Sequence, residues 1–181
     1  MLTNIYDVLR SPKSAMARIA EEADLRKSLN VQAIIYFINA LTNKYDATTD
    51  EPLWMVLLTS VIAVPIAFVI IYLMAGVTHG IAHLMGGQGT WKKQFITLGY
   101  SMLPQMLFIP LEVIFLMFGM ETAVIISAVI ASVWGIVVSV FAVSTVQKLS
   151  IGKSCVVLFA PTAIAFIIGV LIAAVVIYMP Q

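Results

Sequence analysis

Three long stretches without a charged side chain constrain this sequence more than any other feature. They cover residues 53–75, 122–147 and 154–181. The hydrocarbon core of a bilayer is about 30 Å thick, and about 20 apolar helical residues are needed to cross it. Each stretch is therefore long enough to form a transmembrane helix.

A fourth stretch differs in carrying one carboxylate. Residues 94–120 are apolar apart from Glu112, and they contain Pro104 and Pro110. Proline lacks a backbone donor and disturbs a helix interior. Membrane helices tolerate such defects where neighbouring groups satisfy the freed carbonyls. We expect a span that is broken most strongly at these two prolines.

The shortest run, residues 28–43, decides between four spans and five. It is uncharged for 16 residues and contains Asn30, Gln32 and Asn39. At 1.5 Å per residue it reaches about 24 Å, so it crosses the bilayer only with help from its flanks, or it dips in and returns. Its polar side chains favour contact with protein rather than lipid on one face.

The distribution of basic residues favours five spans. Nine of the ten lysines and arginines then lie on one side, in residues 1–27, 76–93 and 148–153, with Lys44 alone opposite. Loops rich in lysine and arginine are typical of the cytoplasmic side. The N-terminus is therefore predicted to be cytoplasmic and the C-terminus external or lumenal, in the cell membrane if the protein is prokaryotic.

The sequence thus predicts an all-α, polytopic membrane protein in two parts. Residues 1–27 form a cytoplasmic amphipathic segment, in which Ser11 and Pro12 are typical of a helix start. This short helix lies on the membrane surface or packs on the bundle. Residues 28–181 form a five-helix transmembrane bundle. Its spans are expected at about residues 28–43, 53–75, 94–120, 122–147 and 154–179.

Composition excludes several classes of protein. Hydrophobic residues make up 61% of the chain and charged residues 10%, whereas soluble domains have about 25% charged residues. A water-soluble enzyme and a disordered protein are therefore excluded. The net charge of +1 provides no field that attracts nucleic acid. The spans contain no paired acids, no serine with a base and no metal-ligand cluster, so the sequence predicts no enzymatic activity and no cofactor.

Glu112 is the residue that most favours a function inside the membrane. An ionisable side chain within a span is costly, and such residues often serve protons, cations or polar partners. The alternative is that Glu112 lies near the outer interface, because Gly119 and Glu121 soon mark a turn.

Two further polar groups follow the second span. His79 and His83 share one helical face, but zinc needs a third or fourth ligand, so hydrogen bonding is favoured over a metal site. A glycine-rich loop comes next, and its backbone amides and lysines can hold a phosphate or an anionic lipid headgroup. The favoured alternative is a simple turn. The residues concerned are Gly86, Gly87, Gly89, Lys92 and Lys93.

Small residues spaced by four form a ridge on each of the last two spans. Such ridges let helices approach closely, which favours packing within one chain and, as the alternative, a homodimer seam. The ridges are Ser127, Ala131, Gly135 and Ser139 on one span, and Ala165, Gly169 and Ala173 on the other.

Several of these residues together resemble the central signature of the Yip family, the Ypt/Rab-interacting membrane proteins. The signature comprises His79, the run from Gly86 to Trp91, and the run from Leu98 to Pro104 that includes Tyr100. The chain lacks the long N-terminal region and the Tyr-Gly-Pro element of eukaryotic members, and it is similar to the compact prokaryotic ones. The resemblance implies membrane organisation, and for eukaryotic members vesicle formation and binding of prenylated GTPases.

Two functions are open at this point. The resemblance favours a non-enzymatic scaffold that organises membranes or binds a partner. Its expected partners are anionic lipid headgroups on the cytoplasmic face, a second copy of the chain and, by resemblance only, a Rab-type GTPase. The alternative is a small channel, transporter or lipid-passage protein that uses Glu112 and the kinked third span.

Overall fold

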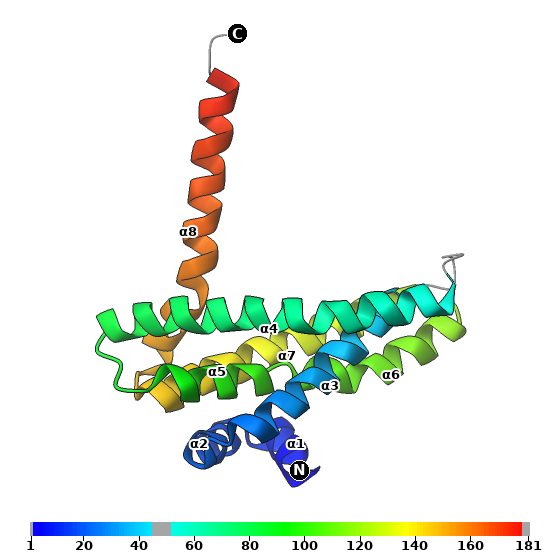
Figure 1. Ribbon diagram of the computed structural model, residues 1–181, viewed down its shortest axis with the longest axis horizontal. Coiled ribbons are helices and arrows are strands. Elements are labelled where there is room, and N and C mark those ends of the chain that lie inside the picture. Colours follow the sequence, from blue (N-terminus) through cyan, green and yellow to red (C-terminus); the bar gives the residue numbers. More distant parts are fainter. Residues whose placement is uncertain (1, 45–51, 179–181) are drawn as a thin grey trace.

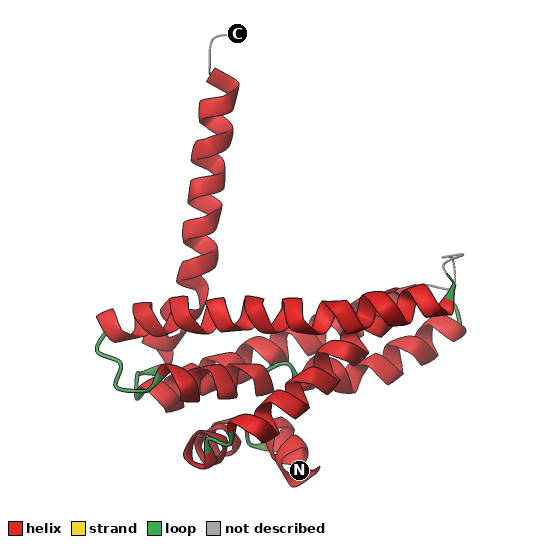
Figure 2. Cartoon of the chain, viewed as in Figure 1, coloured by secondary structure: helices red, strands yellow, loops and turns green. Residues whose placement is uncertain are grey.

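The computed structural model describes residues 2–44 and 52–178, and this part of the chain folds into helices without a strand (Figure 2). The helices are α1 (Leu2–Arg10), α2 (Pro12–Glu22), α3 (Leu25–Lys44), α4 (Leu53–Leu84), α5 (Trp91–Tyr100), α6 (Leu103–Met117), α7 (Glu121–Gln147) and α8 (Ile151–Tyr178). The all-α prediction is therefore confirmed.

The bundle is built from α4, the consecutive helices α5 and α6, and α7, which run side by side (Figure 1). The helix α3 crosses this group and packs mainly on α4 and α5, while α1 and α2 lie beneath it. The helix α8 contacts α7 and α4 near its start and then projects away from the bundle (Figure 1).

In the described part of the chain, four helical stretches are long and apolar enough to cross a membrane: Leu53–Leu84, Trp91–Met117, Glu121–Gln147 and Ile151–Leu171. An integral, multi-pass membrane protein is therefore the right class. The shortest predicted span corresponds to α3, which is not among the four. A fifth span and the orientation of the termini stay predictions.

The third predicted span consists of two helices. The helix α5 ends at Tyr100, and α6 begins at Leu103. Pro104 lies in the first turn of α6, where a missing N–H leaves no hydrogen bond unmade. The helix continues through Pro110. The predicted break therefore occurs just before Pro104, and the expectation of a second break at Pro110 is wrong.

The N-terminal segment contains two helices rather than the one that was predicted. The apolar side of α2 is buried, with Met16 and Ile19 packed into the core that α7 and α5 help to form. An ion pair of 2.6 Å between Arg18 and Asp7 joins α2 to α1. Packing on the bundle is thus observed for α2, and a position on the membrane surface stays a prediction.

A left-handed residue separates α2 from α3. Ala23 has φ of 42° and ends α2. The carboxylate of Asp24 then accepts a hydrogen bond of 3.1 Å from the backbone N–H of Lys27 in the first turn of α3. This hydrogen bond lowers the pKa of Asp24 below its ordinary value, because it favours the ionised form.

Candidate functional site

Polar side chains gather at the two ends of the bundle. At one end, the α4–α5 loop meets the end of α7, and four side chains there form what we call the glutamine cluster: Thr78, His79, Gln94 and Gln147. At the other end, α3, α4, α6 and α7 line an open cavity around Glu112, which we call the Glu112 pocket. The first is a packed network, and the second is open space.

Gln147 is the centre of the glutamine cluster. It is fully buried, and its side-chain amide donates to Gln94 Oε1 and to His79 Nδ1, the latter at 2.9 Å. Gln94, also fully buried, donates to Thr78 Oγ1 at 2.7 Å. These hydrogen bonds join α4, α5 and α7. They also give the buried polar side chains partners, so the free-energy cost of burying them unpaired is avoided.

The glycine-rich loop is held by the same residue. The N–H of Gly89 donates to Gln147 Oε1 and that of Gln88 to the Gln147 carbonyl, both at 3.0 Å. The N–H of Gly87 donates to Ala82 O at 2.8 Å and that of Gly86 to His83 O at 3.0 Å. All four amides are therefore engaged within the chain. The loop is a packed turn, and none of these amides is available to a phosphate.

Backbone conformation explains one glycine of this motif, and close approach explains two others. Gly86 has φ of +90°, a conformation that glycine adopts readily. A Cβ on Gly87 would lie 2.7 Å from Gln147 Oε1, and a Cβ on Gly89 would overlap the Val146 carbonyl oxygen. The loop can pack on the end of α7 only because Gly87 and Gly89 lack side chains.

A similar close approach occurs where α3 crosses α5. A Cβ on Gly99 would overlap the amide of Gln32, which is buried and donates to Ser28 Oγ at 2.7 Å. Tyr100 and Pro104, the next residues singled out by sequence, are also buried. They contribute to the core rather than to an exposed surface.

The two histidines and the two lysines behave differently. His79 is half-buried and hydrogen-bonded within the glutamine cluster, whereas His83 is exposed. The centroids of the two imidazole rings lie 6.3 Å apart. Within residues 2–44 and 52–178, no three metal-binding side chains come together. Lys92 is exposed and Lys93 is half-buried in the first turn of α5, so both can reach a ligand outside the bundle.

The two small-residue ridges have different surroundings. On α7, Ser127, Ala131 and Gly135 are buried within the chain, and a Cβ on Gly135 would lie 3.6 Å from Ser101 O. Ser139 is half-buried beside them. This ridge packs within the chain, which was the favoured interpretation.

On α8 the situation is the opposite. Ala165 is exposed, and no atom would lie within 4 Å of a Cβ on Gly169. The side chain of Ala173 lies outside the described residues. The α8 ridge is therefore available to lipid or to another protein.

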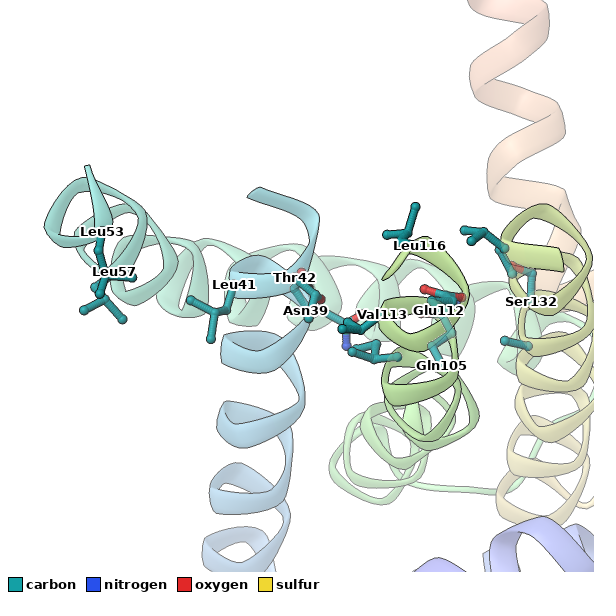
Figure 3. A pocket seen from close by; sticks show the side chains of 14 residues that line it. Asn39, Leu41, Thr42, Leu53, Leu57, Gln105, Glu112, Val113, Leu116 and Ser132 are labelled. Atoms are coloured by element: carbon teal, nitrogen blue, oxygen red, sulfur yellow. Dashed lines mark hydrogen bonds between the residues drawn. The ribbon is translucent and has the colours of Figure 1, made fainter. Parts of the chain in front are cut away.

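The Glu112 pocket has a volume of about 770 Å³. Glu112 and Gln105 project into it from α6, with Asn39 and Thr42 of α3 and Ser132 of α7 around them (Figure 3). Sequence analysis joined the carboxylate and the kinked third span in one alternative function and also described the polar first segment. The fold places all three around one cavity.

A second, apolar groove lies between α3, α4 and α5. It is lined by aromatic side chains with Lys92 among them, and the Trp91 and Phe95 rings stack at 5.8 Å between centroids. The Tyr72 ring meets Trp91 edge-on at 4.5 Å. Aromatic side chains with a basic neighbour are typical of the membrane–water interface.

Sequence reasoning missed the roles of Gln94, Gln147 and Gln105. The available signal was a glutamine inside a run long enough to span a bilayer, since a polar side chain there needs a partner. Glu112 satisfied the same criterion and was noticed because it carries a charge.

A family model described as Yip1 domain matches residues 6–174, nearly the whole chain. No curated protein and no solved structure matches the chain.

Proposed function

Because the chain belongs to the Yip1 domain family, we propose that it is a membrane-organising scaffold without enzymatic activity that self-associates through α8. The family accounts for a multi-pass membrane protein. The finer steps, which are association between copies and contact with particular lipids, are argued below from the described residues.

The observation that carries this proposal is the exposure of α8. Buried residues such as Ser154 and Val157 attach its start to the bundle, but every residue from Thr162 to Leu171 is exposed. Helices in lipid associate by close backbone approach at small residues rather than by the hydrophobic effect. Ala165 and Gly169 offer such an approach, because no other segment among residues 2–44 and 52–178 covers them.

Positive charge supports a contact with lipid headgroups at the end of the bundle that holds the glutamine cluster. Lys153, in the first turn of α8, is exposed, and its Nζ donates to the carbonyl of Met85 at the end of α4 at 3.1 Å. Lys92 and Lys148 are also exposed. Basic residues at the membrane surface attract anionic headgroups by about 1 kcal/mol each. A Rab-type GTPase partner rests on the family resemblance alone.

Gly169→Leu tests the self-association. A leucine at this position keeps the two helix backbones apart, so we expect the oligomer to dissociate. The monomer should stay folded, because a Cβ on Gly169 would have no atom of the described residues within 4 Å. The measurement is the mass of the purified protein in detergent by light scattering. Ile167→Phe, two positions away and hence on the other side of α8, is the matched control and should leave the mass unchanged. An unchanged mass in Gly169→Leu contradicts the seam.

A second candidate function is passage of protons, cations or lipids across the bilayer. The Glu112 pocket favours it, because Asn39, Gln105 and Glu112 line one cavity within an apolar bundle. Polar side chains around an intramembrane carboxylate are a common feature of transport pathways.

Flux through liposomes tests this second candidate. If the pocket conducts, Glu112→Gln should reduce proton, cation or lipid-probe passage to the level of empty vesicles, because the charge that attracts or carries the cation is lost. Glu121→Gln, at the start of α7 and outside the pocket, is the control. If liposomes with the unsubstituted protein show no more flux than empty vesicles, the protein does not conduct protons, cations or lipids.

A further inference from the structure

We propose that the Glu112 pocket binds the primary ammonium headgroup of an amphiphile, with Glu112 holding the ammonium and the apolar walls holding the start of the tail. The inference goes beyond the scaffold function and does not require passage across the bilayer. Four properties of the pocket support it.

The first property is the charge. Glu112 is half-buried, and it forms no hydrogen bond or ion pair with another described residue. The residues that line the pocket include no lysine, arginine or histidine. A carboxylate at the edge of an apolar region is stabilised by a cation that reaches it from outside the protein.

The second property is the supply of hydrogen-bond acceptors. Asn39 donates its amide to Ile35 O at 2.9 Å, which leaves its side-chain oxygen as an acceptor. Thr42 donates its hydroxyl to Ile38 O at 2.8 Å and can accept as well. A primary ammonium has three N–H donors and no acceptor. The pocket thus offers one carboxylate and neutral oxygens to a group that only donates.

The third property is the apolar lining. Leu53 and Leu57 of α4 face the cavity together with Leu116 of α6. All three are also exposed on the outside of the bundle, with Leu116 57% exposed. The walls therefore continue into the lipid-facing surface, and an alkyl chain can extend along them. A volume of about 770 Å³ is far larger than a bare cation needs and lies in the range of sites for organic ligands.

The fourth property is the depth of the carboxylate. Glu112 lies five residues before Met117, where α6 ends, which places it about 8 Å from the end of the helix. The apolar stretch Trp91–Met117 has 27 residues, or about 40 Å at 1.5 Å per residue, which matches a bilayer together with its headgroup regions, so we infer that Glu112 lies near the headgroups. The ammonium can come from phosphatidylethanolamine in the bilayer or from a free long-chain amine, and both present the same group.

Binding of dodecylamine to the purified full-length protein in phosphatidylcholine nanodiscs tests the proposal. Dodecanol and dodecyl phosphate are the neutral and anionic comparisons with the same tail. We expect dodecylamine to bind, and the other two to bind at least tenfold more weakly, because a charge-assisted hydrogen bond contributes a factor of about 10 to 100. Equal binding of dodecanol would overturn the proposal.

Two substitutions and one control locate the site. Glu112→Gln should weaken dodecylamine binding by about 10- to 100-fold, and Glu112→Asp should restore part of it. Glu121→Gln should bind as the unsubstituted protein does. Thermal unfolding of each variant confirms that it is folded. Unchanged binding in a folded Glu112→Gln protein would contradict the assignment.

Competition identifies the source of the ammonium. Phosphatidylethanolamine added to the nanodiscs should displace dodecylamine if a bilayer lipid is the natural ligand. Binding of dodecylamine without such displacement assigns the pocket to a free amphiphile. Phosphatidylcholine, whose ammonium has no N–H donor, is the background in both cases.

Discussion

Replacement of Gln147 by leucine is expected to destabilise the protein more than any other single polar substitution. It removes the donor to Gln94 Oε1, which is fully buried, and the acceptor of the Gly89 N–H, which is half-buried. Leaving a buried polar group unpaired costs about 1 to 3 kcal/mol, although hydrogen bonds between membrane helices average about 0.6 kcal/mol. We expect a loss of about 3 kcal/mol in total and a lower thermal unfolding temperature in detergent, by about 10 °C.

Gln88→Ala is the matched control for this prediction. Gln88 is exposed and contributes only its backbone N–H, which the substitution retains. Its unfolding temperature should stay within about 2 °C of that of the unsubstituted protein, as for most surface changes. If Gln147→Leu unfolds at the same temperature as Gln88→Ala, the glutamine cluster does not stabilise the bundle.

Replacement of Gly89 by alanine is expected to have a comparable effect for a steric reason. The added methyl group would overlap the carbonyl oxygen of Val146, which is backbone and cannot rotate away. The loop must therefore move from α7, with loss of the hydrogen bonds to Gln147. Overpacking of this kind costs about 1 to 3 kcal/mol and occasionally more, and the measurement is again the thermal unfolding temperature.

Gly80→Ala separates this steric effect from the general effect of losing a glycine. Gly80 lies in α4, and a Cβ there would have no atom within 4 Å. Because alanine favours helix over glycine by about 1 kcal/mol, stability should be unchanged or slightly raised. A Gly89→Ala protein as stable as Gly80→Ala would mean that the loop does not pack closely on α7.

Much of the fold could be predicted from local sequence. The uncharged runs indicated α4, α7 and α8, because the length of an apolar run directly limits which spans are feasible. Pro104 indicated the break between α5 and α6, since a proline fits the first turn of a helix. Pro110 has the same chemistry, yet α6 continues through it, and no local signal distinguishes the two positions.

The long-range contacts could not be predicted in this way. Gln94 and Gln147 lie 53 positions apart and pair only because α5 packs on α7. The small residues on α7 and α8 have the same spacing, but Gly135 is buried within the chain and Gly169 is uncovered. Spacing shows that a helix can approach a neighbour closely, and the tertiary fold decides whether that neighbour belongs to the same chain.

The Glu112 pocket combines a feature that local sequence predicts with one that depends on the tertiary fold. A carboxylate within an apolar run was evident from sequence, and it indicated a functional residue on grounds of cost alone. Its surroundings come from α3, α4 and α7 as well as from α6, so the shape and lining of the cavity depend on the fold.

Cysteine crosslinking in native membranes tests the central claim, that α8 joins two copies of the chain, most directly. Cys155 is the one cysteine of the sequence, so Cys155→Ser gives a background without thiols. In that background, Gly169→Cys should form a disulfide-linked dimer under mild oxidation, and Ile167→Cys, on the other side of α8, should form much less. Equal crosslinking at the two positions, or none at either, would contradict the account.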